Sequence, residues 1–356
     1  MLYHLASWLM PFFGPARLLQ SHAVLIVVSL YFGFLATALL LPKLYRFLPH
    51  DRGREFTLTA DAAKGKPTGA GSVFVTFFVL ICVLVAPLDP LQLCMLVLTW
   101  FTMLTGFLDD RSVTSWGEYL KGALDLAICV AASVMLYLFI SRGSADGRLH
   151  FWLPFISRNV IVAPWVYIAV STVLLWMSIN TTNCTDGVDG LSGTLVLIAL
   201  ITMGVIFYFI LGHKEISAYL LVPHLADGAI WAVMTFALAG VLMGYLWHNA
   251  FPSSVLMGDA GSRALGFYIG VCVMVSGNPF LILATSSIIF VNGGMGLMKI
   301  FLMRFFRIRI FQTIRFPLHD HMRHNHHWSP TQVLVKFMIM QVLITIAFVG
   351  VFFKVR

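Results

Sequence analysis

The chain has 356 residues, of which 59% are hydrophobic and only 11% are charged. A soluble domain carries about a quarter of its residues as charged side chains, so this composition excludes an ordinary soluble enzyme and favours a membrane protein. The formal net charge of +8 lies largely in short loops between apolar segments. We expect these cations to set membrane topology and to meet phosphates or anionic headgroups, with no nucleic-acid partner.

Apolar segments follow one another along almost the whole chain. A helix needs about twenty residues to cross a bilayer, and about ten segments meet or approach this length. They are residues 22–43, 72–88, 91–108, 122–141, 160–179, 192–211, 229–247, 260–276, 279–303 and 333–353. We predict an all-α polytopic membrane protein in which residues 1–356 form one domain.

Basic residues are unevenly divided between the loops. The loops after the first, third, fifth, seventh and ninth segments carry most of them, including Lys64, Arg111 and Arg315. Because cytoplasmic loops are enriched in Lys and Arg, we predict that these loops are cytoplasmic and that both termini are periplasmic. The acidic motifs described below fall on the same side, so we expect them to converge on one site.

The first cytoplasmic loop ends in a run of small residues, GKPTGAG at positions 65–71. Glycines let the backbone approach a ligand closely, and Lys64 supplies positive charge beside Thr68. This pattern predicts a phosphate contact, although the spacing is not that of a Walker A loop.

An adjacent pair of carboxylates, Asp109 and Asp110, closes the third apolar segment. Adjacent carboxylates repel each other, so they need a cation, a proton or full solvation. A metal–pyrophosphate site and an acid/base pair are the functional interpretations, and a solvated loop is the structural alternative.

Lys121 and Asp125 begin the next segment at a spacing that favours pairing with each other, and a contact from Lys121 to lipid phosphate is the other possibility.

The most informative stretch is NTTNCTDGVDGL at positions 180–191, between two apolar segments. Asp186 and Asp189 lie beside glycines, and Asn180 and Asn183 precede them. Ionisable groups this close to the hydrocarbon are costly and usually functional. Helix capping is the alternative, but a cap needs one such residue and this loop has four.

Two further polar loops complete the pattern. Asp259 stands beside glycines in LMGDAGS at positions 256–262, where it could cap a helix. Three acidic loops on one face instead predict a site for a hard cation such as Mg²⁺, which binds carboxylate and phosphate oxygens. The last loop is rich in histidine, notably His319 and His321, but its Arg315 and Arg323 favour a phosphate over a transition metal.

Taken together and in this order, these loops resemble those of the polyprenyl-phosphate N-acetylhexosamine-1-phosphate transferases. The family motifs are matched by Asp109 and Asp110, by NxxNxTDGxDG at positions 180–190, and by MGDxGS at positions 257–262, which Asn249 precedes. PxHxH at positions 317–321, leading to Trp328, is typical of the branch with a muramoyl donor. The resemblance extends from the loop that contains Pro67 and Thr68, called the Pro-Thr loop below, to the C-terminus.

The resemblance implies Mg²⁺-dependent transfer of phospho-N-acetylmuramoyl-pentapeptide from its UDP-linked donor to undecaprenyl phosphate. UMP would leave and lipid I would form at the bacterial cytoplasmic (inner) membrane. A homodimer in the lipid bilayer is also implied. Direct displacement and an aspartyl-phosphate intermediate both remain open at this point.

The resemblance also assigns roles residue by residue. Asp259 matches the magnesium ligand, and Asp109 matches the residue that deprotonates the lipid phosphate. The resulting expectations are catalytic roles for Asp109, Asp110, Asp186, His319 and His321, substrate contacts from Asn180, Asn183, Asp189, Asn249, Lys121, Lys64 and Thr68, and metal ligation by Asp259.

Three positions depart from the family pattern. Ala63 stands where the family has lysine, Leu256 where it has a phenylalanine that can stack on uracil, and Asp320 where it has histidine. We expect these changes to affect nucleotide and inhibitor binding while the reaction class is kept.

Two other functions compete with this interpretation. The first is a transferase that uses UDP-N-acetylglucosamine for another surface polymer. The second is a transporter of a lipid-linked sugar, but transporters place ionisable groups near the membrane midplane, whereas these carboxylates cluster at one boundary.

Overall fold

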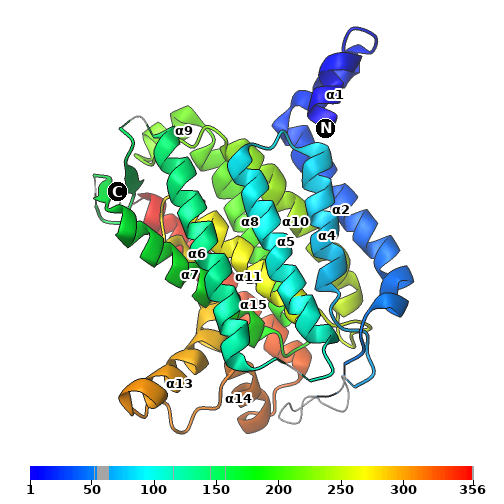
Figure 1. Ribbon diagram of the computed structural model, residues 1–356, viewed down its shortest axis with the longest axis vertical. Helices are drawn as coiled ribbons and strands as arrows, with labels where there is room; N and C mark the ends of the chain where they lie inside the picture. Colours follow the sequence, from blue (N-terminus) through cyan, green and yellow to red (C-terminus); the bar gives the residue numbers. More distant parts are fainter. Residues whose placement is uncertain (52, 54–63, 115, 145, 157, 355–356) are drawn as a thin grey trace.

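The computed structural model describes residues 1–51, 53, 64–114, 116–144, 146–156 and 158–354. These residues form a helical bundle with one small two-stranded sheet (Figure 1). The first half contains α1 (Leu2–Leu9), η1 (Gly14–Gln20), α2 (His22–Leu44), η2 (Tyr45–Phe47), α4 (Gly71–Val85), α5 (Pro90–Arg111), α6 (Glu118–Gly143), β1 (Leu149–Phe151), β2 (Val160–Val162) and α7 (Pro164–Thr185). The second half contains α8 (Leu191–Val205), η3 (Ile206–Leu211), α9 (Lys214–Tyr219), α10 (Gly228–Asn249), α11 (Gly258–Val275), α12 (Leu281–Ile289), η4 (Phe290–Gly294), α13 (Met295–Phe306), α14 (Leu318–Asn325) and α15 (Pro330–Lys354).

The predicted all-α polytopic architecture is confirmed. Within the described residues, eight helical stretches are long and apolar enough to cross a membrane. The other two predicted segments also form helices, but α4 has only 15 residues and α11 is less apolar. The membrane orientation of the two termini stays a prediction.

Helix α11 lies at the centre of the bundle. Every residue from Asp259 to Val275 is buried, and the helix packs against α4, α5 and α7. By contrast, the outer helices expose large apolar side chains, as in α2, where Leu39 is 63% exposed. Because α11 contacts protein on all sides, it can carry charged residues without exposing them to lipid.

The predicted segment 279–303 is not one straight helix. It divides into α12, a π-helical turn at η4 and α13, and α13 then leaves the bundle (Figure 1). A π-helical turn inside a helix often marks a functional site, and this one places Asn292 in the interior.

A short antiparallel hairpin joins α6 to α7, with Leu149 opposite Val162 and Phe151 opposite Val160. We did not predict it from the sequence. It lies at the end of α6 opposite to Lys121, so it does not contribute to the polar face described next.

Candidate functional site

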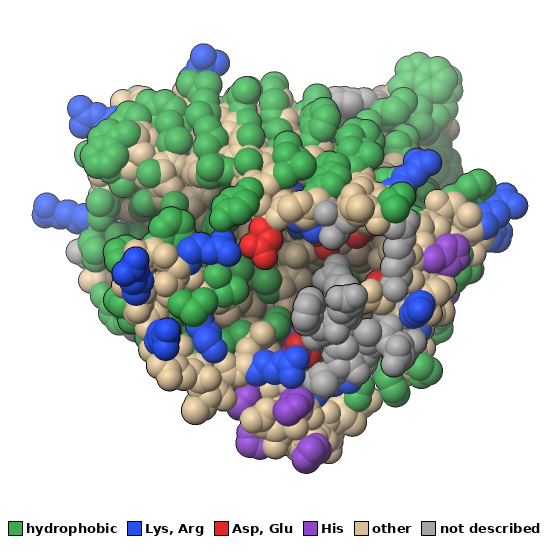
Figure 2. Space-filling view, turned by 60° about the horizontal axis from the view of Figure 1, so that its bottom comes forward, with side chains coloured by type: hydrophobic (Ala, Val, Ile, Leu, Met, Phe, Trp, Pro, Cys, Tyr) green, Lys and Arg blue, Asp and Glu red, His purple; other side chains and the backbone are tan. Residues whose placement is uncertain are grey.

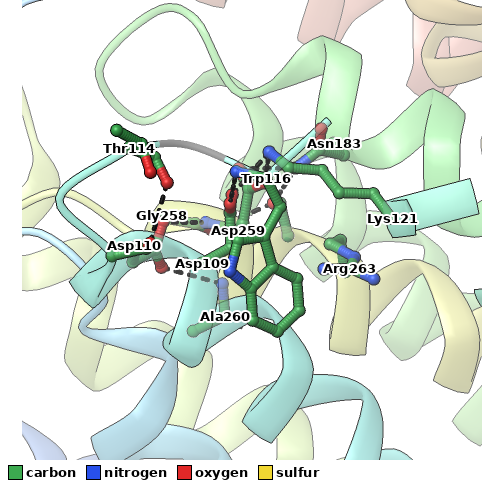
Figure 3. A network of polar contacts seen from close by, with 12 residues as sticks. Asp109, Asp110, Thr114, Trp116, Lys121, Asn183, Gly258, Asp259, Ala260 and Arg263 are labelled. Atoms are coloured by element: carbon green, nitrogen blue, oxygen red, sulfur yellow. Dashed lines mark hydrogen bonds and ion pairs between the residues drawn. The ribbon is translucent and has the colours of Figure 1, made fainter. Parts of the chain in front are cut away.

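The polar face is the end of the bundle at which the loops with the acidic motifs meet. At its centre, one lysine lies between two aspartates from different helices (Figure 3). Lys121 Nζ lies 2.5 Å from Asp109 Oδ2 and 3.1 Å from Asp259 Oδ2. Both carboxylates are buried, and Asp109 also accepts a hydrogen bond from Trp116 N at 2.7 Å. The three charges sum to −1, so this carboxylate–lysine cluster retains an attraction for a further cation.

Asn183, in the last turn of α7, orients the third side of the cluster. Its Nδ2 donates to Asp259 Oδ1 and to Ser262 Oγ, each at 3.0 Å. Asn180, one turn earlier, instead donates to the carbonyl oxygen of Trp176 within its own helix. The structure thus joins Asn183 to the cluster, while the described contact of Asn180 is local.

Asp110 holds the start of α11. Its two carboxylate oxygens accept hydrogen bonds from the backbone N–H groups of Asp259 and Ala260, each at 3.0 Å. A carboxylate at the N-terminus of a helix satisfies otherwise unpaired N–H groups and interacts favourably with the helix dipole. Gly258 has φ +72°, and a Cβ there would lie 2.3 Å from Asp110 Oδ2. Asp110 therefore fixes the backbone that carries Asp259.

A cleft of about 570 Å³ lies next to this cluster. Figure 2 shows this end of the bundle, where Lys and Arg side chains surround a hollow in which acidic side chains are visible. The cleft is lined by Asp51, Lys66, Thr68, Asp186, Gly187, Val188, Asp189, Asn249, Phe251, Pro252, Ser253, Leu256, Met257, Gly258, Arg323 and Pro330. Four segments far apart in the sequence therefore meet here, and the cleft borders two of the acidic motifs that we expected to converge, Asp186–Asp189 and the loop that ends at Gly258.

Hydrogen bonds between loops define the wall of the cleft. Asp189 Oδ2 accepts from Ser253 N at 3.0 Å, and Lys66 Nζ donates to Ser253 Oγ at 3.1 Å. Asn249 bridges two loops, since its Oδ1 accepts from Gly190 N and its Nδ2 donates to the Val255 carbonyl, both at 2.8 Å. Asn249 thus shapes the wall that it lines.

The Pro-Thr loop is fixed to the loop before α11. Leu256 N donates to the Pro67 carbonyl at 2.8 Å, and Ala70 N donates to the Leu256 carbonyl at 3.1 Å. This pairing brings Thr68 and Leu256 to the same wall of the cleft. An aliphatic side chain therefore stands where the family pattern has an aromatic one.

His319 lies in the histidine-rich segment before α15 and contacts both η4 and the loop that carries Asp186. Its backbone N–H donates to Asn292 Oδ1 at 2.8 Å, and its Nδ1 lies 3.0 Å from Asn292 Nδ2. Nδ1 also lies 3.2 Å from Asn292 Oδ1, so the Asn292 side chain holds this edge of the ring. A Cβ on Gly187 would lie only 2.5 Å from Nε2, so only glycine allows this approach. Burial lowers the pKa of His319 to about 4, so the ring is neutral at pH 7.

Two of the predicted site residues that do not line the cleft are His321, expected to be catalytic, and Lys64, expected to contact substrate. His321 is partly exposed, and its Nδ1 accepts from Arg315 N at 3.4 Å. Lys64 is exposed, whereas the neighbouring Lys66 lines the cleft. Asp320 lies 3.7 Å from His319 Nε2, and Ala63 falls outside the described residues.

Sequence reasoning did not identify three residues that organise this region. Asn292 positions His319, and Ser253 links Asp189 to Lys66. Arg263 pairs with Asp125, so Asp125 does not take up the local pairing with Lys121 that its spacing allowed. The only sequence signals were an amide and a guanidinium inside apolar segments.

Known proteins resemble this chain over most of its length. The model of glycosyl transferase family 4 matches residues 92–277. A phospho-N-acetylmuramoyl-pentapeptide-transferase of Treponema pallidum (strain Nichols) is 58% identical, over 98% of this chain and 95% of that protein. Proteins of the same name from Gemmatimonas aurantiaca and Helicobacter pylori (strain HPAG1) are 32% and 29% identical, over 91% and 89% of this chain and 91% and 90% of their own lengths.

Proposed function

This chain belongs to glycosyl transferase family 4, and on that premise we propose a full reaction with its donor, its acceptor and its metal. The chain is a multi-pass membrane phosphotransferase of lipid I synthesis. The donor is UDP-N-acetylmuramoyl-pentapeptide, the acceptor is undecaprenyl phosphate, and the reaction requires Mg²⁺. The polar face is cytoplasmic, in the inner membrane of a bacterium.

The observation that carries this proposal is the meeting of Asp109, Lys121 and Asp259 beside a cleft that charged and apolar side chains line together. Phosphoryl transfer between two polyanions is mainly a problem of positioning and of charge neutralisation. The cleft supplies Lys66 and Arg323 at its wall, and the cluster supplies Lys121. A soluble nucleotide can enter from the aqueous side while an isoprenoid tail stays in the bilayer.

The donor atoms fit Mg²⁺. Among the described residues, no group of three or more His, Cys, Asp or Glu side chains could hold a metal by itself. Mg²⁺, however, is usually bound through one or two carboxylates, with waters and substrate phosphates completing its shell. Asp259 and Asp109 converge on one ammonium group, so they can also face one metal ion. When bound, Mg²⁺ would neutralise charge on the pyrophosphate and polarise it.

The side chains then divide the remaining work. Asp109 accepts the proton of the lipid phosphate, and a phosphate oxygen attacks the β-phosphorus of the donor. The bond from this phosphorus to the bridging oxygen breaks, and UMP leaves with that oxygen. Lys121 offsets the negative charge that gathers on the oxygens during the transfer. His319, neutral at pH 7, presents its Nε2 to the loop that carries Asp186.

The nucleotide lies along the cleft in this scheme. Asp189 and Asn249 line it together with Thr68. Outside the cleft lining, Asn183 holds Asp259 through a hydrogen bond. Leu256 gives an apolar surface to the base but no stacking partner. From family membership we also infer a homodimer, which light scattering in detergent would test.

The test of the reaction uses donor labelled in its β-phosphate. The expected result is label in the lipid product and none in UMP, with no transfer by Asp259→Ala. Label in UMP would contradict attack at the β-phosphorus. Label trapped on the protein would replace direct attack with an aspartyl-phosphate intermediate.

A further inference from the structure

A second ion pair lies one helical turn further along α6 and α11 than the carboxylate–lysine cluster. Arg263 Nη2 contacts Asp125 Oδ1, and these residues are 2% and 1% exposed. Asp125 follows Lys121 by four residues on α6, and Arg263 follows Asp259 by four on α11. The two contacts between α6 and α11 are therefore stacked, because residues four apart share one face of a helix.

Without Arg263, the nearest partner for Asp125 is Lys121. Oppositely charged side chains four residues apart on a helix attract each other. In the structure, Lys121 instead reaches across to Asp109 and Asp259. Arg263 occupies the competing carboxylate and so leaves the ammonium group of Lys121 to the cluster.

The environment of Arg263 is poorly explained by packing alone. Its Nε and Nη1 are buried, and among the described residues neither has a hydrogen-bond partner. Burying unpaired guanidinium N–H groups is unfavourable, and replacing a buried ion pair by apolar residues is often neutral or stabilising. A role that requires the positive charge accounts for the cost.

We propose that Arg263 is a positioning residue of the transferase: by holding Asp125 it directs Lys121 to Asp109 and Asp259. This inference rests on the proposed function. Loss of the Arg263 charge turns Lys121 toward Asp125. The two cluster carboxylates then lose their internal cation, and the transferred phosphoryl group loses a positive charge.

The decisive comparison is between R263M and the double variant D125N/R263M. Of the two variants, only R263M keeps the Asp125 carboxylate, which then has no arginine partner and competes for Lys121. We therefore expect R263M to lower kcat for UMP release about tenfold or more, and the double variant to recover to within about threefold of wild type. R142M, an exposed arginine at the other end of α6, is the matched control and keeps wild-type turnover. If R263M does not fold, R263Q replaces it with the same expectations.

The affinity for Mn²⁺ without substrates, measured by electron paramagnetic resonance, distinguishes the proposed role from a general loss of folded structure. We expect R263M to bind Mn²⁺ more tightly than wild type while turning over more slowly, since its two carboxylates lack Lys121. The double variant should return to wild-type affinity. Wild-type turnover by R263M, weaker Mn²⁺ binding by R263M, or a folded double variant as slow as the single one would overturn the inference. Absence of UMP release by the wild type would instead contradict the proposed function.

Discussion

Substitution of Asp110 by Asn separates a role in holding α11 from a role in catalysis. The two oxygens of Asp110 accept from two adjacent backbone N–H groups, those of Asp259 and Ala260. In D110N one oxygen becomes an NH₂ group that faces an N–H donor. The start of α11 packs closely against α5, since a Cβ on Gly106 would lie 2.5 Å from the Asp259 backbone.

The expected loss follows from these contacts. A hydrogen bond to a charged group contributes about 1.5–3 kcal/mol, and a negative charge near a helix N-terminus contributes about 0.3–1 kcal/mol. D110N gives up one such bond and the charge, so we expect about 2–4 kcal/mol of lost stability. Asp109→Asn is the matched control. Its partner Lys121 has a 27% exposed side chain that can turn toward water and keeps Asp259, so the loss is smaller.

Thermal melting of both variants in the same detergent, together with UMP release, measures the difference. We expect both to lose transfer, D110N with a melting temperature several degrees below wild type and D109N close to it. A D110N protein that melts with the wild type, or a D109N protein that is the less stable of the two, would refute the assignment of Asp110 to the start of α11.

Three further predictions concern the metal, the nucleotide and pH. EDTA should stop UMP release and added Mg²⁺ should restore it, whereas turnover without divalent metal would remove the metal from the account. Leu256→Phe should lower the KM for the UDP-linked donor by about threefold to tenfold, because a ring adds about 0.5–1.5 kcal/mol of stacking on uracil; an unchanged KM would place the base elsewhere. The pKa of His319 is about 4 in the folded protein against 6.5 as its ordinary value, so its contribution to stability is complete above about pH 6.5 and is lost as the pH falls toward 4. Between about pH 7 and about pH 5 this loss amounts to about 2 kcal/mol, and the melting temperature of wild type should fall more than that of His319→Gln; equal slopes would contradict a buried neutral ring.

The bundle and the convergence of the acidic loops could be predicted because both follow from short-range patterns. Long apolar runs define membrane helices, and the uneven distribution of Lys and Arg placed Asp109, Asp186 and Asp259 on one side. In the structure, Asp109 and Asp259 share Lys121, and Asp186 lines the adjacent cleft.

Partner choice between distant segments could not be predicted in the same way. Asp110 was expected to be catalytic beside Asp109, and no local pattern predicted that it accepts hydrogen bonds from the N–H groups that begin α11. Asp125 was placed beside Lys121 by its spacing, and its partner Arg263 lies 138 residues away. The π-helical turn that presents Asn292 to His319 depends on packing between helices, and no local sequence pattern specifies it.

The central claim is that this polar face transfers a phospho-muramoyl-pentapeptide to a lipid phosphate. The most direct test is UMP release by the purified protein in detergent with undecaprenyl phosphate and Mg²⁺. Either UDP-N-acetylmuramoyl-pentapeptide or UDP-N-acetylglucosamine is supplied as donor. We expect UMP with the muramoyl donor alone. UMP with only the N-acetylglucosamine donor would contradict the assigned substrate, and no UMP with either donor from folded protein would contradict the reaction itself.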